Sequence, residues 1–203
     1  MLLRTLMLIF AFVPVMQGTT VPNISEVLNT SDKTWVYSTA NNSDDYKCAS
    51  YTKKTILCEH HFCFYYYNYY FEKNCTTKRE TRIAEIQQEC LVTDYRHKPC
   101  VVTRNMSTPY FDEEDSKVLV YWDESKLCGV YKVLPAPSRE HTPRRNPESQ
   151  ECELHVRDKP LGGEKNAEKK SAIERCKGEF YKQCPRNHTE TFIYSAMCCN
   201  KTL

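Results

Sequence analysis

Between Trp35 and Val156 the chain alternates short runs of β-branched and aromatic residues with polar turns. Such runs favour β-strands, because branched and ring side chains pack well on a pleated surface. Eight consecutive short strands predict an antiparallel meander, and closure into a barrel would remove its exposed edges. The predicted strands are residues 34–39, 46–52, 62–71, 81–88, 100–104, 117–122, 128–133 and 152–156.

After the last strand the apolar period changes from two residues to that of a helix. Ile173, Cys176 and Phe180 recur at helical spacing, and Ser171 is placed to act as an N-cap. We therefore expect one amphipathic helix over residues 171–184, following the eight strands.

The ends of the chain suggest how it is processed. Residues 1–18 have the basic start, short apolar run and small final residue of a secretory signal peptide. No later segment approaches the roughly 20 apolar residues of a membrane span. We expect a polar, loosely held leader over 19–33 and a single domain over 34–203.

Composition places the chain outside the cell. Its 28 basic and 26 acidic residues leave no charge excess for nucleic acid or an anionic membrane. Its 12 cysteines, an even number in a secretory context, predict disulfides. Glycosylation is predicted at seven Asn-x-Ser/Thr sequons, Asn23, Asn29, Asn41, Asn74, Asn105, Asn187 and Asn200.

The segment "CEHHFC" raises the question of a metal. Cys58 and Cys63 enclose His60 and His61, but adjacent side chains in a strand point to opposite faces. No second Cys/His pair follows with the spacing of a structural zinc site. The chain also has no phosphate loop and no nucleophile elbow. We expect no metal, no cofactor and no enzymatic activity.

The tyrosine-rich run that follows is better suited to a binding wall. A tyrosine ring needs a partner for its hydroxyl when it is buried, and its face attracts organic cations. Sequence alone leaves open which of two faces points inward. One carries Tyr65, Tyr67, Tyr69 and Phe71, and the other carries Phe64, Tyr66, Asn68 and Tyr70.

The eighth strand carries chemistry on one face. Cys152, Leu154 and Val156 alternate with Glu153 and His155. If the apolar face packs against the helix, Glu153 and His155 point into the barrel; otherwise they form an exposed polar face. A carboxylate inside a barrel needs a cation, and a bound amine would supply one.

Several short motifs occur in a familiar order: "DYKCASY", "SKLCGVYKV", "CELHVRD", "IERC" and "FIYSAMC". Over about residues 34–199 the chain resembles the tick salivary lipocalins of the histamine-binding protein family. The resemblance implies an eight-stranded antiparallel lipocalin barrel with a C-terminal helix packed outside. It also implies secretion in saliva and capture of a small host mediator.

The resemblance also implies two disulfides. Cys48 would bond to Cys198, with Cys199 as the rival partner, and Cys128 would bond to Cys176. The sequence does not assign disulfide partners to the eight other cysteines.

Amine binding in the family uses inward carboxylates and aromatic rings. Glu153 matches the family's inward glutamate, with His155 two residues on, and Glu80 is a match to a second acid. Gly129 stands where histamine binders carry aspartate. The resemblance therefore implies one amine site, around Glu153, and we take Tyr65, Tyr67 and Tyr69 as the candidate residues of its aromatic wall.

We therefore expect a secreted, monomeric carrier of a biogenic amine such as histamine or serotonin, used to evade host defence. One alternative is a carrier of fatty acids or leukotrienes, for which Arg82 and Arg104 are candidate cations. The other is a module that binds a host protein through the basic, proline-rich loop at residues 135–150.

Overall fold

A computed structural model gives the fold of the chain. It describes residues 23–39, 47–59, 62–73, 76–90, 95, 97–104, 113–123, 125, 127–135, 151–158 and 165–184. The elements are α1 (Ile24–Leu28), β1 (Lys33–Thr39), β2 (Lys47–Glu59), β3 (Phe62–Lys73), β4 (Thr76–Gln87), β5 (Cys100–Arg104), β6 (Glu113–Trp122), β7 (Cys128–Pro135), β8 (Glu151–Asp158) and α2 (Lys165–Gln183).

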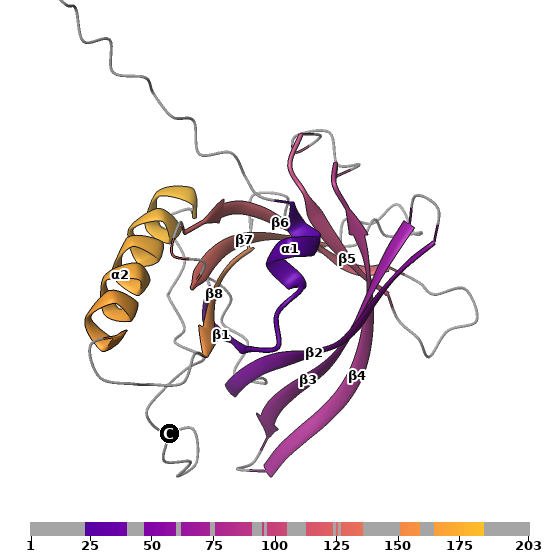
Figure 1. The fold of residues 1–203 in the computed structure, drawn as a ribbon, viewed down its shortest axis with the longest axis horizontal. Helices are drawn as coiled ribbons and strands as arrows, with labels where there is room; N and C mark the ends of the chain where they lie inside the picture. Colours follow the sequence, from indigo (N-terminus) through magenta and orange to yellow (C-terminus); the bar gives the residue numbers. More distant parts are fainter. Residues whose placement is uncertain are drawn as a thin grey trace, which may run out of the picture.

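The eight strands form a closed antiparallel barrel in the order of the sequence, with β8 paired to β1. All eight predicted strands are present, several of them longer than predicted. Figure 1 shows α2 outside the barrel beside β6, β7 and β8, and α1 within the ring of strands. The predicted fold class is confirmed. No helix of the described segments is long and apolar enough to span a membrane.

Helix α2 packs on the apolar face of β8. Leu154 and Val156 are buried in one cluster with Ala172, Cys176 and Phe180 of the helix. This contact fixes the orientation of β8, because alternate side chains of a strand point to opposite faces. The predicted contact between the last strand and the helix is confirmed.

Two expectations about the helices were wrong. Helix α2 begins at Lys165, so Ser171 lies inside it and is not its N-cap. Residues 165–170 are rich in good helix formers, which extend the helix toward its N-terminus. The predicted loose leader contains α1, whose Ile24, Val27 and Leu28 are buried.

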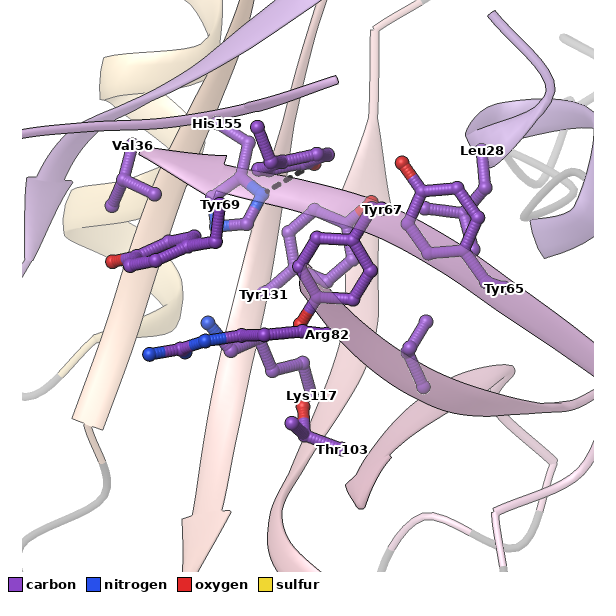
Figure 2. A pocket seen from close by; sticks show the side chains of 12 residues that line it. Leu28, Val36, Tyr65, Tyr67, Tyr69, Arg82, Thr103, Lys117, Tyr131 and His155 are labelled. Atoms are coloured by element: carbon purple, nitrogen blue, oxygen red, sulfur yellow. Dashed lines mark hydrogen bonds between the residues drawn. The ribbon is translucent and has the colours of Figure 1, made fainter. Parts of the chain in front are cut away.

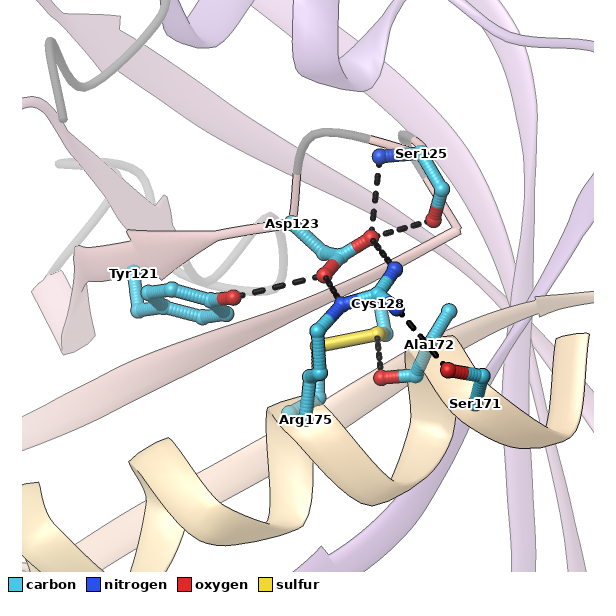
Figure 3. Close-up of polar contacts among 8 residues, drawn as sticks. Tyr121, Asp123, Ser125, Cys128, Ser171, Ala172 and Arg175 are labelled. Atoms are coloured by element: carbon cyan, nitrogen blue, oxygen red, sulfur yellow. Dashed lines mark hydrogen bonds and ion pairs between the residues drawn. A yellow bond between two sulfur atoms is a disulfide. The ribbon is translucent and has the colours of Figure 1, made fainter. Parts of the chain in front are cut away.

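A polar cluster holds α2 against the turn between β6 and β7 (Figure 3). The Asp123 carboxylate, 1% exposed, accepts bonds from Nε and Nη2 of Arg175 at 2.8 and 3.0 Å. It also accepts bonds from the backbone N–H and hydroxyl of Ser125 and, at 3.3 Å, from the Tyr121 hydroxyl. These bonds satisfy both oxygens of the Asp123 carboxylate, whose burial without partners would destabilise the fold.

Disulfides join the α2 region to β7 and β8, and one closes the hairpin between β2 and β3. The implied Cys128–Cys176 bond is present and links β7 to α2. Two further bonds, Cys152–Cys184 and Cys58–Cys63, pair cysteines that the sequence left unpaired. Cys48 is disulfide-bonded, while its expected partners Cys198 and Cys199 lie outside the described residues.

Candidate ligand-binding site

The barrel encloses a cavity lined mainly by tyrosines (Figure 2). Its volume is about 40 Å³, whereas pockets for drug-sized ligands measure roughly 300–1,000 Å³. The side chains therefore fill most of the interior. The lining residues are Leu28, Val36, Tyr51, Tyr65, Tyr67, Tyr69, Arg82, Val101, Thr103, Lys117, Tyr131 and His155.

The structure decides which face of the tyrosine-rich strand points inward. Tyr65, Tyr67 and Tyr69 of β3 line the cavity, and Phe71 is buried on the same face. The rings of Tyr65 and Tyr67 stack with their centroids 4.9 Å apart. Tyr51, from β2, meets Tyr67 edge to face at 5.9 Å. The sequence did not single out Tyr51, because its strand carries few other signs of function.

Glu153 and His155 point into the barrel, which is the arrangement expected if the apolar face of β8 packs against the helix. The cation beside Glu153 belongs to the protein itself: Lys117 Nζ of β6 lies 2.7 Å from Glu153 Oε2. His155 Nε2 lies 2.7 Å from the same oxygen, and His155 Nδ1 lies 3.0 Å from the Tyr51 hydroxyl. A neutral His155 with its proton on Nε2 donates to Glu153 and accepts from Tyr51.

The protonation states of Glu153, Lys117 and His155 follow from their burial and from the ion pair and hydrogen bonds among them. Burial alone would raise the pKa of Glu153, but Lys117 and the His155 bond hold that pKa well below its usual range. Burial opposes the charge on Lys117, yet Glu153 and Asp115 raise the pKa of the ammonium above normal. Burial lowers the pKa of His155, which is therefore neutral at pH 7. The interior thus holds one internal ion pair and a neutral imidazole.

Arg82 is a second cation that lines the cavity, and its side chain is 28% exposed. The Arg82 guanidinium lies 4.1 Å from the centre of the Tyr69 ring. Its Nη2 is 3.0 Å from Glu80 Oε2, and the Glu80 side chain is 49% exposed. Glu80 therefore holds Arg82 and does not line the cavity. Burial raises the pKa of Tyr69 to about 12, so its hydroxyl is a neutral donor.

The other candidate cation lies on the outside of the barrel. Arg104 bonds Glu85 at 2.6 Å, and Glu85 lies on the face of β4 opposite to Ala84 and Ile86, which are buried in the interior. Arg104 is consequently no ligand-binding candidate, whereas Lys117, which the sequence did not single out, is one. Lys117 sits at the start of an apolar run, and only the folded structure shows that its partner is Glu153.

The α1 end of the barrel is filled by an aromatic ring. A Cβ on Gly129 would lie 2.6 Å from Trp122 Cε3, so this position has no room for a side chain. The guanidinium of Arg157 lies 4.8 Å from the centre of the Trp122 ring. At Gly129, where the resemblance would place an aspartate, a side chain could be accommodated only if Trp122 moved.

Several remaining predictions concern other surfaces. Asn23 caps α1 by accepting a bond from the Ser25 N–H, and Asn29 accepts from Lys53 Nζ; both asparagines are exposed. Cys58 and Cys63 are joined to each other, so neither thiol is available to zinc. Outside the described residues lie His60, His61, most of the basic loop at 135–150, and the sequons at Asn41, Asn74, Asn105, Asn187 and Asn200.

Comparisons with known proteins concern the fold. No family model matches the sequence, and no curated protein matches it. Among solved structures, AM182 in complex with serotonin has a TM-score of 0.47 at 12% identity, covering 83% of this chain and 85% of that one. Japanin from Rhipicephalus appendiculatus, bound to cholesterol, has a TM-score of 0.47 at 10% identity, covering 87% and 98%.

The strand order decides the architecture: eight antiparallel neighbours, closed between β8 and β1, with one C-terminal helix outside. This is the lipocalin fold. All eight strands and α1 contribute side chains to the cavity, so no single sequence motif contains the site.

Proposed function

We propose that this lipocalin is a secreted carrier that captures a small host mediator, and that the mediator is an amphiphile bearing a carboxylate. The observation that carries the proposal is the pair of protein cations, Arg82 and Lys117, that line a cavity walled by tyrosine rings. The sequence motifs shared with tick salivary lipocalins support secretion in saliva and a role in evading host defence.

The polar groups of the cavity are mostly donors. Glu80 takes bonds from Nε and Nη2 of Arg82, and a guanidinium carries five N–H donors, so others remain for a ligand. The hydroxyls of Tyr67 and Tyr69 are neutral because burial raises their pKa values. Such a set of donors fits the oxygens of a carboxylate, while the tyrosine rings offer apolar contact to the rest of the ligand.

Binding has to enlarge the cavity. Tyr69 and Arg82 are partly exposed and stack on each other, so they are the lining groups best placed to move when a ligand enters. We expect capture by mass action, with no chemistry on the ligand. Ligand binding would then replace the contact between guanidinium and ring by contacts with the ligand.

A biogenic amine is the second candidate. Glu153 and His155 point toward the cavity as the amine hypothesis requires, and the buried Asp115 Oδ1 accepts no hydrogen bond from the described residues. Against an amine, Lys117 already neutralises Glu153, and an incoming ammonium would meet Lys117 and Arg82 at close range. An amine could therefore pair with Glu153 only by displacing the ammonium group of Lys117.

Calorimetric titration with dodecanoate and with dodecanol tests the proposal. Dodecanoate should bind at one per chain, and Arg82→Gln should weaken it by at least about tenfold, or 1.4 kcal/mol. Arg79→Gln is the matched control, because Arg79 is exposed and bonds Asn68 on the outer face. The affinity for dodecanol, which has no carboxylate, should be unchanged by either substitution. Absence of dodecanoate binding, or equal binding to Arg82→Gln, would contradict the proposal.

A further inference from the structure

Strand β2 has an edge that β1 does not cover. β2 pairs with β3 from Lys47 to Glu59, but its register with β1 contains only Tyr51 and Ser50. Among the described residues, no strand pairs with residues 52–59 on the β1 side, and no backbone hydrogen bond from another segment reaches them. We call residues 52–59, on their β1 side, the open edge. Folded proteins usually cover such an edge, because its unpaired backbone groups invite association with other chains.

The Cys58–Cys63 pair shows which backbone groups face the open edge. The two Cα atoms, directly opposite each other, are 4.1 Å apart, the short spacing of a pair that exchanges no backbone hydrogen bonds. The N–H and C=O of Cys58 therefore point away from β3. Because the pattern alternates, those of Ile56 do so too. These groups are left to water or to a covering group from outside the sheet.

A groove runs along this edge, between β2 and α1. Its volume is about 460 Å³, within the roughly 300–1,000 Å³ of pockets that hold drug-sized molecules, whereas the barrel cavity measures about 40 Å³. Because Ile56 belongs both to the lining and to the open edge, an occupant of the groove can reach backbone groups of the edge. The lining residues are Ser25, Glu26, Asn29, Lys53, Lys54, Thr55 and Ile56.

The walls of the groove are polar and mixed in charge. The lining includes Glu26 as well as two lysines, and β2 ends in Glu59, so charge selects neither an acidic nor a basic occupant. A serine and a threonine hydroxyl, the two ammonium groups and the carboxylate together offer both donors and acceptors. Such walls fit a neutral molecule with many hydroxyl groups, because each hydroxyl both donates and accepts.

Asn29 provides an attachment point for such a molecule. It begins the sequon Asn29-Thr30-Ser31, is exposed and lines the groove. A lysine ammonium can only donate, so the bond of 2.8 Å from Lys53 Nζ fixes Oδ1 of Asn29 toward β2. The Asn29 Nδ2, the atom that carries an N-linked oligosaccharide, makes no bond to a described residue. The contact with Lys53 and a sugar on Nδ2 are therefore compatible.

From this geometry we infer that an N-linked oligosaccharide on Asn29 lies in the groove and covers the open edge of β2. Its first two sugars, both N-acetylglucosamine, carry hydroxyl and acetamide groups that can bond the N–H and C=O of Ile56 and Cys58. Attachment at Asn29 holds these sugars at a high effective concentration, so weak contacts are enough to keep them in the groove. The inference shares only secretion with the proposed function and does not depend on any ligand of the barrel.

The test uses the mature, disulfide-intact protein secreted from insect cells, which add N-linked oligosaccharides. Mass spectrometry of glycopeptides should find Asn29 occupied. Ser31→Ala removes the sequon and leaves the Asn29 side chain unchanged, so the effect of the sugar is separated from that of the amide. In this variant the amides of Ile56 and Cys58 should exchange hydrogen at least about tenfold faster than in the unchanged protein.

Asn23→Asp is the matched control at the other end of α1. It removes the sequon of Asn23 and keeps a side-chain oxygen that can cap the helix. Both exchange rates should stay as they are in the unchanged protein. If Ser31→Ala is not secreted, enzymatic removal of the oligosaccharides from the folded, unchanged protein gives the same comparison.

Three results would overturn the inference. The first is an unmodified Asn29 in the secreted protein. The second is a modified Asn29 together with equal exchange of the Ile56 and Cys58 amides in Ser31→Ala and the unchanged protein, which would mean that the sugar does not cover the edge. The third is a dimer of the glycosylated protein joined through the open edge, because a second copy would then occupy the place of the sugar.

Discussion

Lys117 and Glu153 form an ion pair inside the barrel, with the lysine Nζ 2.7 Å from the glutamate Oε2. The two residues are 36 positions apart, on β6 and β8, and do not belong to neighbouring strands. Both strands flank β7, and the two side chains meet on the inner side of the barrel. The proposed preference for an acid over an amine rests on this pair, because Lys117 already neutralises Glu153.

Replacing one partner of this ion pair should lower the free energy of unfolding more than replacing both partners. Lys117→Met leaves Glu153 buried without its cation, and we expect a loss of about 3–5 kcal/mol in the free energy of unfolding. The double variant Lys117→Met/Glu153→Gln should be more stable than Lys117→Met alone. Urea unfolding at pH 7 measures all three proteins. Equal stability of the single and double variants would show that Glu153 does not destabilise the fold when its cation is absent, which contradicts the prediction.

Glu153→Gln separates the two ligand hypotheses. Without the carboxylate, Lys117 is released to interact with a ligand, so dodecanoate should bind at least as tightly as to the unchanged protein. If the barrel is an amine carrier, the same change should weaken histamine or serotonin binding by at least about tenfold. Calorimetry of both ligand classes against this single variant gives opposite results under the two hypotheses.

The contact between Asp123 and Arg175 predicts a dependence of stability on pH. Burial opposes the charge of Asp123, but Arg175 and Ser125 lower the pKa of its carboxyl to about 2. Its stabilising effect is therefore complete above the ordinary aspartate pKa of about 4 and is lost as the pH falls toward 2. Asp123→Asn should cost about 1–3 kcal/mol at pH 7.

Urea midpoints at pH 7, 4 and 2 measure this effect, and the difference between Asp123→Asn and the unchanged protein should shrink toward pH 2. Glu174→Gln, an exposed acid on α2, serves as the control and should change little. A difference that stays constant with pH would mean that the charge of Asp123 plays no part.

Gly129, at the α1 end of the barrel, and Gly178, on α2 outside it, provide a matched test of packing. Gly129→Ala would press a methyl group against the Trp122 ring, and we expect a loss of about 1–3 kcal/mol. Gly178→Ala, where an added Cβ meets nothing within 4 Å, should instead stabilise α2 by about 0.5–1 kcal/mol. Thermal unfolding of the two variants should therefore shift in opposite directions.

The sequence predicted the barrel well because its strands carry local signals. Alternation along β8 was enough to place Glu153 and His155 inside once Leu154 and Val156 were assigned to the helix. It was not enough to find Lys117, whose role depends on a contact between side chains of β6 and β8, two strands that do not pair with each other. The short helix α1 was missed because five residues, with three apolar side chains, give little periodicity to detect.

The inward face of the tyrosine run shows the same limit. Both faces of residues 64–71 are aromatic, so the period of two gives no preference. The pairing of β3 with β2 and β4 decides the matter, since it sets Tyr65 opposite Ile56 and Ala84. Register is a property of the closed sheet and cannot be read from one strand.

The most direct test of the account is calorimetric titration of one preparation of the mature, disulfide-intact protein with dodecanoate, histamine and serotonin in turn. The account predicts saturable binding of dodecanoate near one per chain and little or no binding of either amine, because Lys117 and Arg82 face the cavity. Stoichiometric binding of an amine, with no response to dodecanoate, would contradict it and return Glu153 to the role of ligand counter-ion.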